Sequence, residues 1–153
     1  VNLEKSNKYK KSPVLLMIDN FLNKYCKDDD IIVYSHVTSP FIKLKTIKEA
    51  IKVLNKGYES VSSASFHNEF GLVNKNNKFK RINFTDKIVK KTQDLDPIVL
   101  LNGAFFIFKK KVFKKYNSRY GKKHYYFKLE YPETIDINYQ SELKMTKIYA
   151  KQK

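Results

Sequence analysis

The sequence predicts a single α/β domain, and two observations carry this prediction. Segments whose apolar residues recur at helical spacing alternate along the chain with short β-branched or aromatic runs that are typical of strands. The chain has 153 residues, 42% of them hydrophobic and 14% aromatic, which is enough for one core and too little for two domains. We therefore treat residues 1–153 as one domain.

The first half of the chain predicts two helices and two strands in alternation. Ser12 and Pro13 provide an N-cap and a first-turn proline for the first helix, and Gly57 provides the stop of the second. The β-branched run that starts at Ile31 predicts a strand buried on both faces. The second strand completes a β-α-β unit, whose crossover implies that the two strands pair in parallel. These four elements are expected at residues 13–25, 31–34, 46–55 and 60–66.

The second half begins with a change of pattern. Two short runs flank the polar residues 74–78, which predicts a hairpin over residues 70–84. The apolar run 98–108 predicts a core strand that the pair Asn102-Gly103 interrupts. A lysine-rich helix, an aromatic strand and a final helix are expected at residues 110–116, 125–129 and from about 141 onward.

The formal charge of +16 raises the question of nucleic-acid binding, because lysine and arginine neutralise phosphates. Only Arg81 and Arg119 are arginines, whereas planar phosphate and base recognition favours the arginine fork. The lysines are scattered over nearly every segment, as a general bias toward lysine would also produce. Nucleic-acid binding is therefore less well supported than an enzymatic role.

The sequence contains neither a signal-peptide pattern nor an apolar run of the roughly 20 residues that a membrane helix needs. The single cysteine, Cys26, lies outside any metal-binding or CxxC spacing, which favours a structural thiol. We expect a cytoplasmic protein without a membrane partner.

Four separated segments carry a family resemblance. His36-Val37-Thr38-Ser39-Pro40-Phe41 is similar to a QPTSPL turn, and the segment 57–63, GYESVSS, is similar to a G-x-D-S-V-x-S stretch. The segments 92–95, TQDL, and 102–107, NGAFFI, resemble an SQDLP…NGAIYI block, and residues 135–138, IDIN, resemble an IDIDTxxDL signature. Together and in this order, they resemble the acylneuraminate cytidylyltransferase family.

The resemblance implies a three-layer, Rossmann-like fold of the kind found in nucleotide-diphospho-sugar transferases. It also implies transfer of CMP from CTP to an acidic nine-carbon sugar, dependence on Mg²⁺ and a homodimer. Residues 70–91, around the hairpin, would belong to the dimer contact. The sequence leaves the sugar open among sialic, legionaminic, pseudaminic and related acids.

The resemblance also implies a set of site residues. Asp136 corresponds to the first Asp of the signature, where a carboxylate at a strand end can hold the metal and serve catalysis, and Asn138 corresponds to the second. The expected substrate-binding residues are His36, Thr38, Ser39, Gln93, Asn102 and Phe106.

Each of these assignments has a structural alternative. Asp136 can organise the turn before the last helix, and Thr38 and Ser39 can form an ordinary capped turn. Three positions depart from the family pattern, because a neutral Asn replaces the second Asp, Phe106 replaces a tyrosine and Ile42 replaces a frequent arginine. These departures put metal affinity and the choice of sugar in question.

The family's glycine- and lysine-containing loop, which cradles the triphosphate, has no counterpart in the sequence. We therefore expect a truncated piece that lacks the N-terminal βα units and shows little cytidylyltransferase activity alone. The alternatives are a non-catalytic family remnant that dimerises or binds a sugar and, less well supported, a basic nucleic-acid-binding protein.

Overall fold

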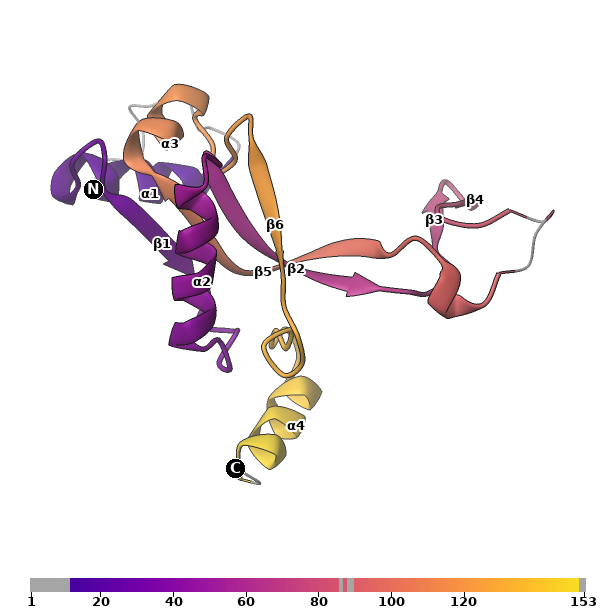
Figure 1. Ribbon diagram of the computed structural model, residues 1–153. Coiled ribbons are helices and arrows are strands. Elements are labelled where there is room, and N and C mark those ends of the chain that lie inside the picture. Colours follow the sequence, from indigo (N-terminus) through magenta and orange to yellow (C-terminus); the bar gives the residue numbers. More distant parts are fainter. Residues whose placement is uncertain (1–11, 86, 88–89, 152–153) are drawn as a thin grey trace.

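The computed structural model describes residues 12–85, 87 and 90–151, and confirms a mixed α/β chain (Figure 1). The helices in these ranges are α1 (Pro13–Tyr25), α2 (Leu44–Asn55), α3 (Lys110–Tyr116) and α4 (Gln140–Lys151), with a short 3-10 helix at Thr92–Asp94. The strands are β1 (Ile31–Ser35), β2 (Ser60–His67), β3 (Leu72–Lys75), β4 (Lys78–Arg81), β5 (Ile98–Lys109) and β6 (His124–Lys128). The expected helices and strands are present, except that the strand end expected at Asp136 is a loop. The predicted capping role of Ser12 is wrong, because its side chain makes no capping hydrogen bond.

The four-stranded sheet has the order β1-β5-β2-β6. β5 lies between β1 and β2 and is antiparallel to both, so the predicted direct pairing of those two strands is wrong, although they run in the same direction. The parallel neighbours are instead β2 and β6. β5 has a strand on either side, and its residues Phe105 and Phe108 are fully buried, as expected for an apolar run inside a sheet.

Helices cover both faces of this sheet, which gives three layers (Figure 1). Phe105 and Ile107 of β5 pack in the core beneath α2, together with Ala50 and Leu54. The alternate residues of β5 pack in a second core with α1 and α3, because successive strand residues point to opposite faces. This second core contains Ile18, Leu22, Phe106, Phe108 and Phe113, and the free thiol of Cys26 packs at its edge.

The prediction that β1 is buried on both faces is wrong. Ile31 and Val33 are 36% and 41% exposed, whereas Ile32 and Tyr34 pack against the core of α1. Within the described ranges β1 pairs only with β5, so it is an edge strand of the sheet. β1 therefore has one packed and one exposed face, which short apolar runs in the sequence do not reveal.

A two-stranded ribbon extends from the sheet and carries the β3–β4 hairpin and the 3-10 helix at its end (Figure 1). We call the described residues between 65 and 101 the arm. Asn83 ties its distal end together, because its side chain accepts from the Gly71 N–H at 3.0 Å and donates to the Glu69 and Asp96 carbonyls. Eight large apolar side chains of the arm are exposed: Phe70, Leu72, Val73, Phe79, Ile82, Val99, Leu100 and Leu101.

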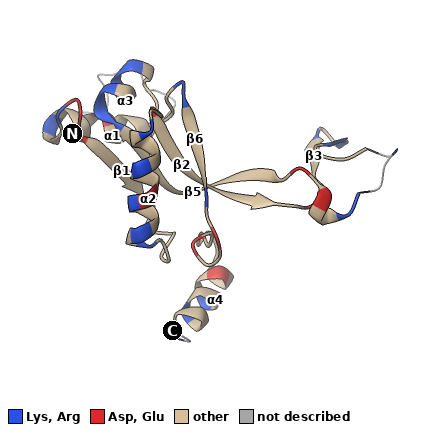
Figure 2. Cartoon of the chain, viewed as in Figure 1, with Lys and Arg blue, Asp and Glu red and all other residues tan. Residues whose placement is uncertain are grey.

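The positive charge is distributed over separate elements. Figure 2 shows lysine and arginine on α2, on α3 and on the arm, with acidic residues between them. Lysines of α3 pair locally with acidic residues, as in the contact of 2.7 Å between Lys111 and Asp29. None of the helices that the structure describes is long and apolar enough to cross a membrane.

Candidate functional site

Two turns that are distant in sequence meet beyond the carboxyl end of β1. The Ser39 N–H donates to the His36 carbonyl at 3.2 Å and closes a tight turn directly after the strand. The Ile137 N–H donates to the Thr38 carbonyl at 2.9 Å, which places the loop of Asp136 on that turn. The edge formed by the carboxyl ends of parallel strands is where open α/β sheets bind ligands. The contact therefore brings together two of the segments that carry the family resemblance.

Three polar side-chain atoms at this edge are buried without a hydrogen-bond partner. They are Ser39 Oγ, Asn102 Nδ2 and Asp136 Oδ1, and they are the only such atoms among the described residues. Buried polar atoms of native proteins are nearly always paired, so each exception calls for an explanation. All three residues were predicted from the sequence as site residues. An ordered water, an ion or a polar ligand would each provide the missing partners.

The Asn102-Gly103 pair interrupts β5, as expected, through a bulge. Ser62 pairs with Phe106 but Ala64 pairs with Leu101, so β5 has extra residues between these two pairs. Gly103 has φ of +70°, and a Cβ added there would lie 3.7 Å from the His36 ring. A left-handed conformation favours glycine, and within the bulge Asn102 Oδ1 accepts from the Ala104 N–H at 3.4 Å.

The Ser63 hydroxyl supports this bulge from the neighbouring strand. Its oxygen accepts from the Phe105 N–H at 3.0 Å, at a point where the backbone of β2 does not pair with β5. Ser63 and Phe105 are both fully buried. Without this bond, the Phe105 N–H would be a buried donor with no hydrogen-bond partner.

Phe106 and His36 belong to one aromatic cluster on the α1 side of the sheet. The His36 ring lies 5.2 Å from Tyr34 and 6.5 Å from Phe106, measured between centroids. Arg119 covers the cluster, with its guanidinium carbon 3.9 Å from the Phe106 centroid and 5.4 Å from that of Tyr34. Arg119 was not predicted as a site residue, although it is one of two arginines in a lysine-rich chain.

Two grooves border the predicted residues. His36 and Ser39 line one of about 360 Å³ between β1 and the start of α2. Asp136 lines another of about 610 Å³ between its loop and α4. The predicted residues thus border spaces that can admit a ligand.

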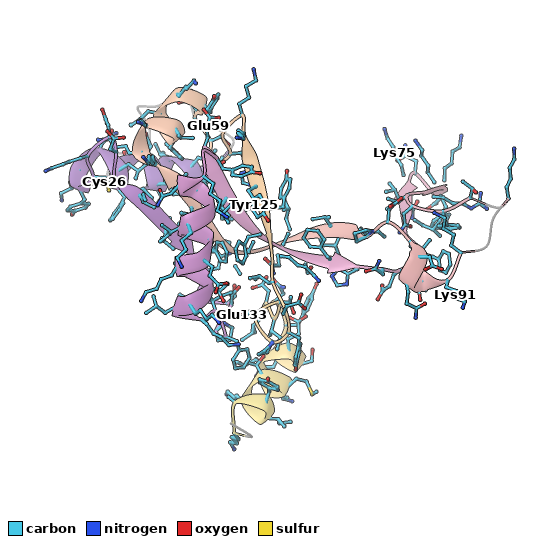
Figure 3. The ribbon with its side chains drawn as sticks, in the orientation of Figure 1. Cys26, Glu59, Lys75, Lys91, Tyr125 and Glu133 are labelled. Carbon is cyan, nitrogen blue, oxygen red and sulfur yellow. The ribbon has the colours of Figure 1, made fainter. Side chains whose placement is uncertain are left out.

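Gln93 does not join this group. It is an exposed residue of the 3-10 helix in the arm. Figure 3 shows the neighbouring Lys91 at the distal end of the arm, far from Glu133 and the loop that follows it. Gln93 and Asp136 of one chain therefore lie on different surfaces of the protein.

The predicted magnesium ligands are only partly arranged for a metal. Residues 134–138 form a loop rather than the end of a strand, because β6 already ends at Lys128. The Asn138 amide donates to Asp136 Oδ2 at 3.2 Å, whereas Asp136 Oδ1 is buried without a hydrogen-bond partner. The described residues contain no group of three or more His, Cys, Asp or Glu side chains that could hold a metal. Asp136 therefore fits one coordination position, and substrate oxygens and water would have to provide the others.

A carboxylate that sequence reasoning missed anchors the loop of Asp136. Glu133, which is 7% exposed, accepts hydrogen bonds of 2.7 Å from the Lys43 N–H and from the Thr46 hydroxyl. These donors lie at the start of α2, whose own N-cap residue makes no capping hydrogen bond. Glu133 thus caps a helix from a distant part of the chain and places a negative charge at its positive end.

His124 forms a second polar group, half-buried on the sheet face of Phe106, where Tyr120 contacts both rings. Its two ring nitrogens lie 2.7 Å from the Ser60 hydroxyl and 2.9 Å from the Ser62 hydroxyl. Both serines are fully buried. Burial lowers the pKa of the His124 imidazole from its ordinary value of 6.5 to about 4.

This low pKa predicts a loss of stability in mild acid. Below pH 6.5 the unfolded chain binds a proton at His124 that the folded chain accepts only near pH 4. Stability is therefore lost as the pH falls through this window, by about 2 kcal/mol for a half-buried ring. Urea denaturation at pH 7.5 and pH 4.5 measures the loss. His124→Gln removes the titrating group and should reduce the difference between the two pH values; an unchanged difference would contradict the prediction.

No protein-family model matches the sequence, and no curated protein matches it significantly. What the chain does must therefore be inferred from its own residues and their geometry. The geometry gathers His36, Ser39, Asn102 and Asp136 at one edge of the sheet and leaves three of their buried polar atoms without partners.

Proposed function

We propose that this chain is part of a nucleotidyltransferase that transfers CMP from CTP to an acidic nine-carbon sugar. The observation that carries the proposal is the set of three unpartnered buried atoms on Ser39, Asn102 and Asp136. All three are among the residues for which the family resemblance implies a site role. The proposed fold is Rossmann-like, which the helix-sheet-helix layers and the position of these residues beyond the carboxyl end of β1 support.

In the proposed reaction a hydroxyl oxygen of the sugar bonds to the α-phosphorus of CTP, and the bond to pyrophosphate breaks. Positioning the two substrates supplies much of the rate enhancement in such transfers. The Asn102 amide would donate to a sugar oxygen, and the Ser39 hydroxyl would bind the substrate beside it. Asp136 would hold Mg²⁺, which would supply positive charge to offset the negative charge of the phosphates.

Sugar binding by the 153-residue chain tests this proposal directly. We expect saturable binding of N-acetylneuraminate in calorimetry and none of the neutral sugar N-acetylmannosamine. Asn102→Ala should weaken binding on the order of tenfold, because it removes a buried donor that the ligand satisfies. Asn74→Ala, the same change on the exposed arm, provides the control. Absence of saturable binding by the unmutated chain would refute the proposal.

A non-catalytic sugar-binding module is the second candidate. The Asn138 amide contacts Asp136 Oδ2 where the family places a second carboxylate, which weakens the case for a metal-dependent step. The two candidates differ in their response to nucleotide. Binding of CTP with Mg²⁺ to the sugar-loaded chain favours the transferase, and sugar binding that CTP does not affect favours the module.

We further propose that two copies associate through the arm. Eight of its large apolar side chains are exposed, and exposed apolar surface of this kind favours contact with another protein. Association would also bring Gln93 of one copy to a surface of the other.

Analytical ultracentrifugation tests the association. We expect a dimer at micromolar concentration and dissociation by Leu72→Asp, since Leu72 is 54% exposed on the arm and a charge there opposes burial. Val37→Asp is the control, because Val37 is 97% exposed on the body of the protein. A monomeric unmutated chain, or equal dissociation by both variants, would contradict this prediction.

A further inference from the structure

The loop between α3 and β6 holds Arg119 in a fixed place above the sheet. The Gly121 N–H donates to the Ser60 hydroxyl at 2.7 Å, and the Lys123 N–H donates to Glu59 Oε2 at 3.0 Å. A Cβ added to Gly121 would come within 2.4 Å of the Glu59 Cβ, so the loop backbone lies directly on the start of β2. A loop anchored in this way positions its side chains without the cost of ordering them on binding.

Arg119 packs on aromatic rings, and no hydrogen bond of its guanidinium is found within the described part of the chain. Its guanidinium stacks on Phe106, and among the described residues no carboxylate pairs with it. This situation contrasts with α3, where Lys111, Lys114 and Lys115 all have acidic partners. A stacked guanidinium keeps its N–H donors in the plane of the group, pointing outward from the ring.

His36 adds a second donor to the same cluster. Its ring lies beside both Tyr34 and Phe106, the two rings that Arg119 covers. It also lies against Gly103, next to Asn102 and its unpartnered amide nitrogen. Neutral imidazole donates one N–H. The cluster therefore combines an arginine fork and an imidazole donor on an aromatic wall, and Asn102 directly precedes the glycine that lies against the imidazole.

We propose that Arg119 and His36 form the subsite that recognises the carboxylate of the acidic sugar. Guanidinium and carboxylate are both planar, so two parallel hydrogen bonds can form between them. Phe106 provides the floor on which Arg119 stacks, and Asn102 binds a neighbouring sugar oxygen. This assignment deepens the proposed function and rests on it. A phosphate group shares the oxyanion chemistry and is the competing ligand.

Arg119→Lys tests the assignment, because lysine keeps the positive charge and loses the fork. The control is Lys122→Ala, which removes one charge from an exposed residue of the same loop. N-acetylneuraminate, its methyl ester and inorganic phosphate are titrated into each variant by calorimetry. We expect Arg119→Lys to weaken acid binding on the order of tenfold and ester binding less than about twofold. Lys122→Ala should change neither by more than about twofold.

Equal weakening of acid and ester would overturn the assignment, because it would show that Arg119 supports the site only by packing. Tighter binding of phosphate than of the acid sugar at Arg119 would overturn the choice of carboxylate. NMR spectra of the unmutated chain separate this failure from failure of the proposed function. Acid sugar that binds without shifting the Arg119 and His36 side-chain signals refutes the subsite alone. Absence of any sugar binding refutes both.

Discussion

Glu133→Ala is expected to lower the free energy of unfolding by about 3 kcal/mol. The substitution leaves two donors at the start of α2, the Lys43 N–H and the buried Thr46 hydroxyl, without their charged acceptor. It also removes the only described side-chain cap at this end of α2. Urea denaturation monitored by circular dichroism measures the loss.

Two further substitutions identify the cause of this loss. Glu133→Gln keeps an oxygen acceptor without the charge and should cost less than the alanine substitution. Glu130→Ala removes an exposed carboxylate from the same loop, where it pairs with Lys128 at 2.9 Å, and should cost less than about 1 kcal/mol. Similar losses for Glu130→Ala and Glu133→Ala would show that the helix cap contributes little.

Because Glu133 lies three residues before Asp136, its loss should also loosen the candidate site. Hydrogen exchange of the Ile137 amide, which donates to the Thr38 carbonyl, reports on this loop. We expect the Ile137 amide to exchange faster in Glu133→Ala than in the unmutated chain. The increase should be larger than the loss of global stability accounts for.

Phe113→Ala is expected to cost about 4 kcal/mol, the largest loss that we predict for a single substitution. Phe113 is fully buried and stacks on Phe108, with centroids 5.7 Å apart. It is the main apolar anchor of α3, a helix of seven residues that consists otherwise mainly of lysines. A short helix of this kind depends on tertiary packing rather than on its own propensity.

Phe21→Ala provides the matched control, since the same atoms are removed from a side chain on α1 that is 52% exposed. We expect a loss of about 1 kcal/mol or less for this variant. Comparable losses for the two variants in urea denaturation would mean that α3 is not held by its buried phenylalanine. Since α3 leads into the loop of Arg119, Phe113→Ala should also weaken binding of the acidic sugar.

The elements that could be predicted from the sequence are those whose cause is local. The helix after Pro13 and the lysine-rich helix that ends at Tyr116 appear at the expected residues, because proline and apolar spacing act within a few positions. The bulge at Gly103 was visible for the same reason, as an Asn-Gly pair inside an apolar run.

Features that depend on distant residues were missed. Apolar runs predict strands but do not say which strand lies beside which, so the position of β5 between β1 and β2 was not foreseen. The partners of Glu133 are at the start of α2, and no local pattern connects them. Arg119 was missed because only the structure shows that its guanidinium packs over the ring of Phe106.

The central position of β5 also determines when the sheet can form during synthesis. Ile31 of β1 pairs with Lys109, and β2 finds its partners in β5 and in the still later β6. A nascent chain that ends before residue 98 therefore contains α1, α2 and four strands, and the only described pairing among these strands is that of β3 with β4. Contacts of such long range form slowly, because the intervening chain must close a loop first. The N-terminal half thus leaves the ribosome with its apolar surfaces uncovered, which makes it a natural substrate for chaperones until β5 emerges.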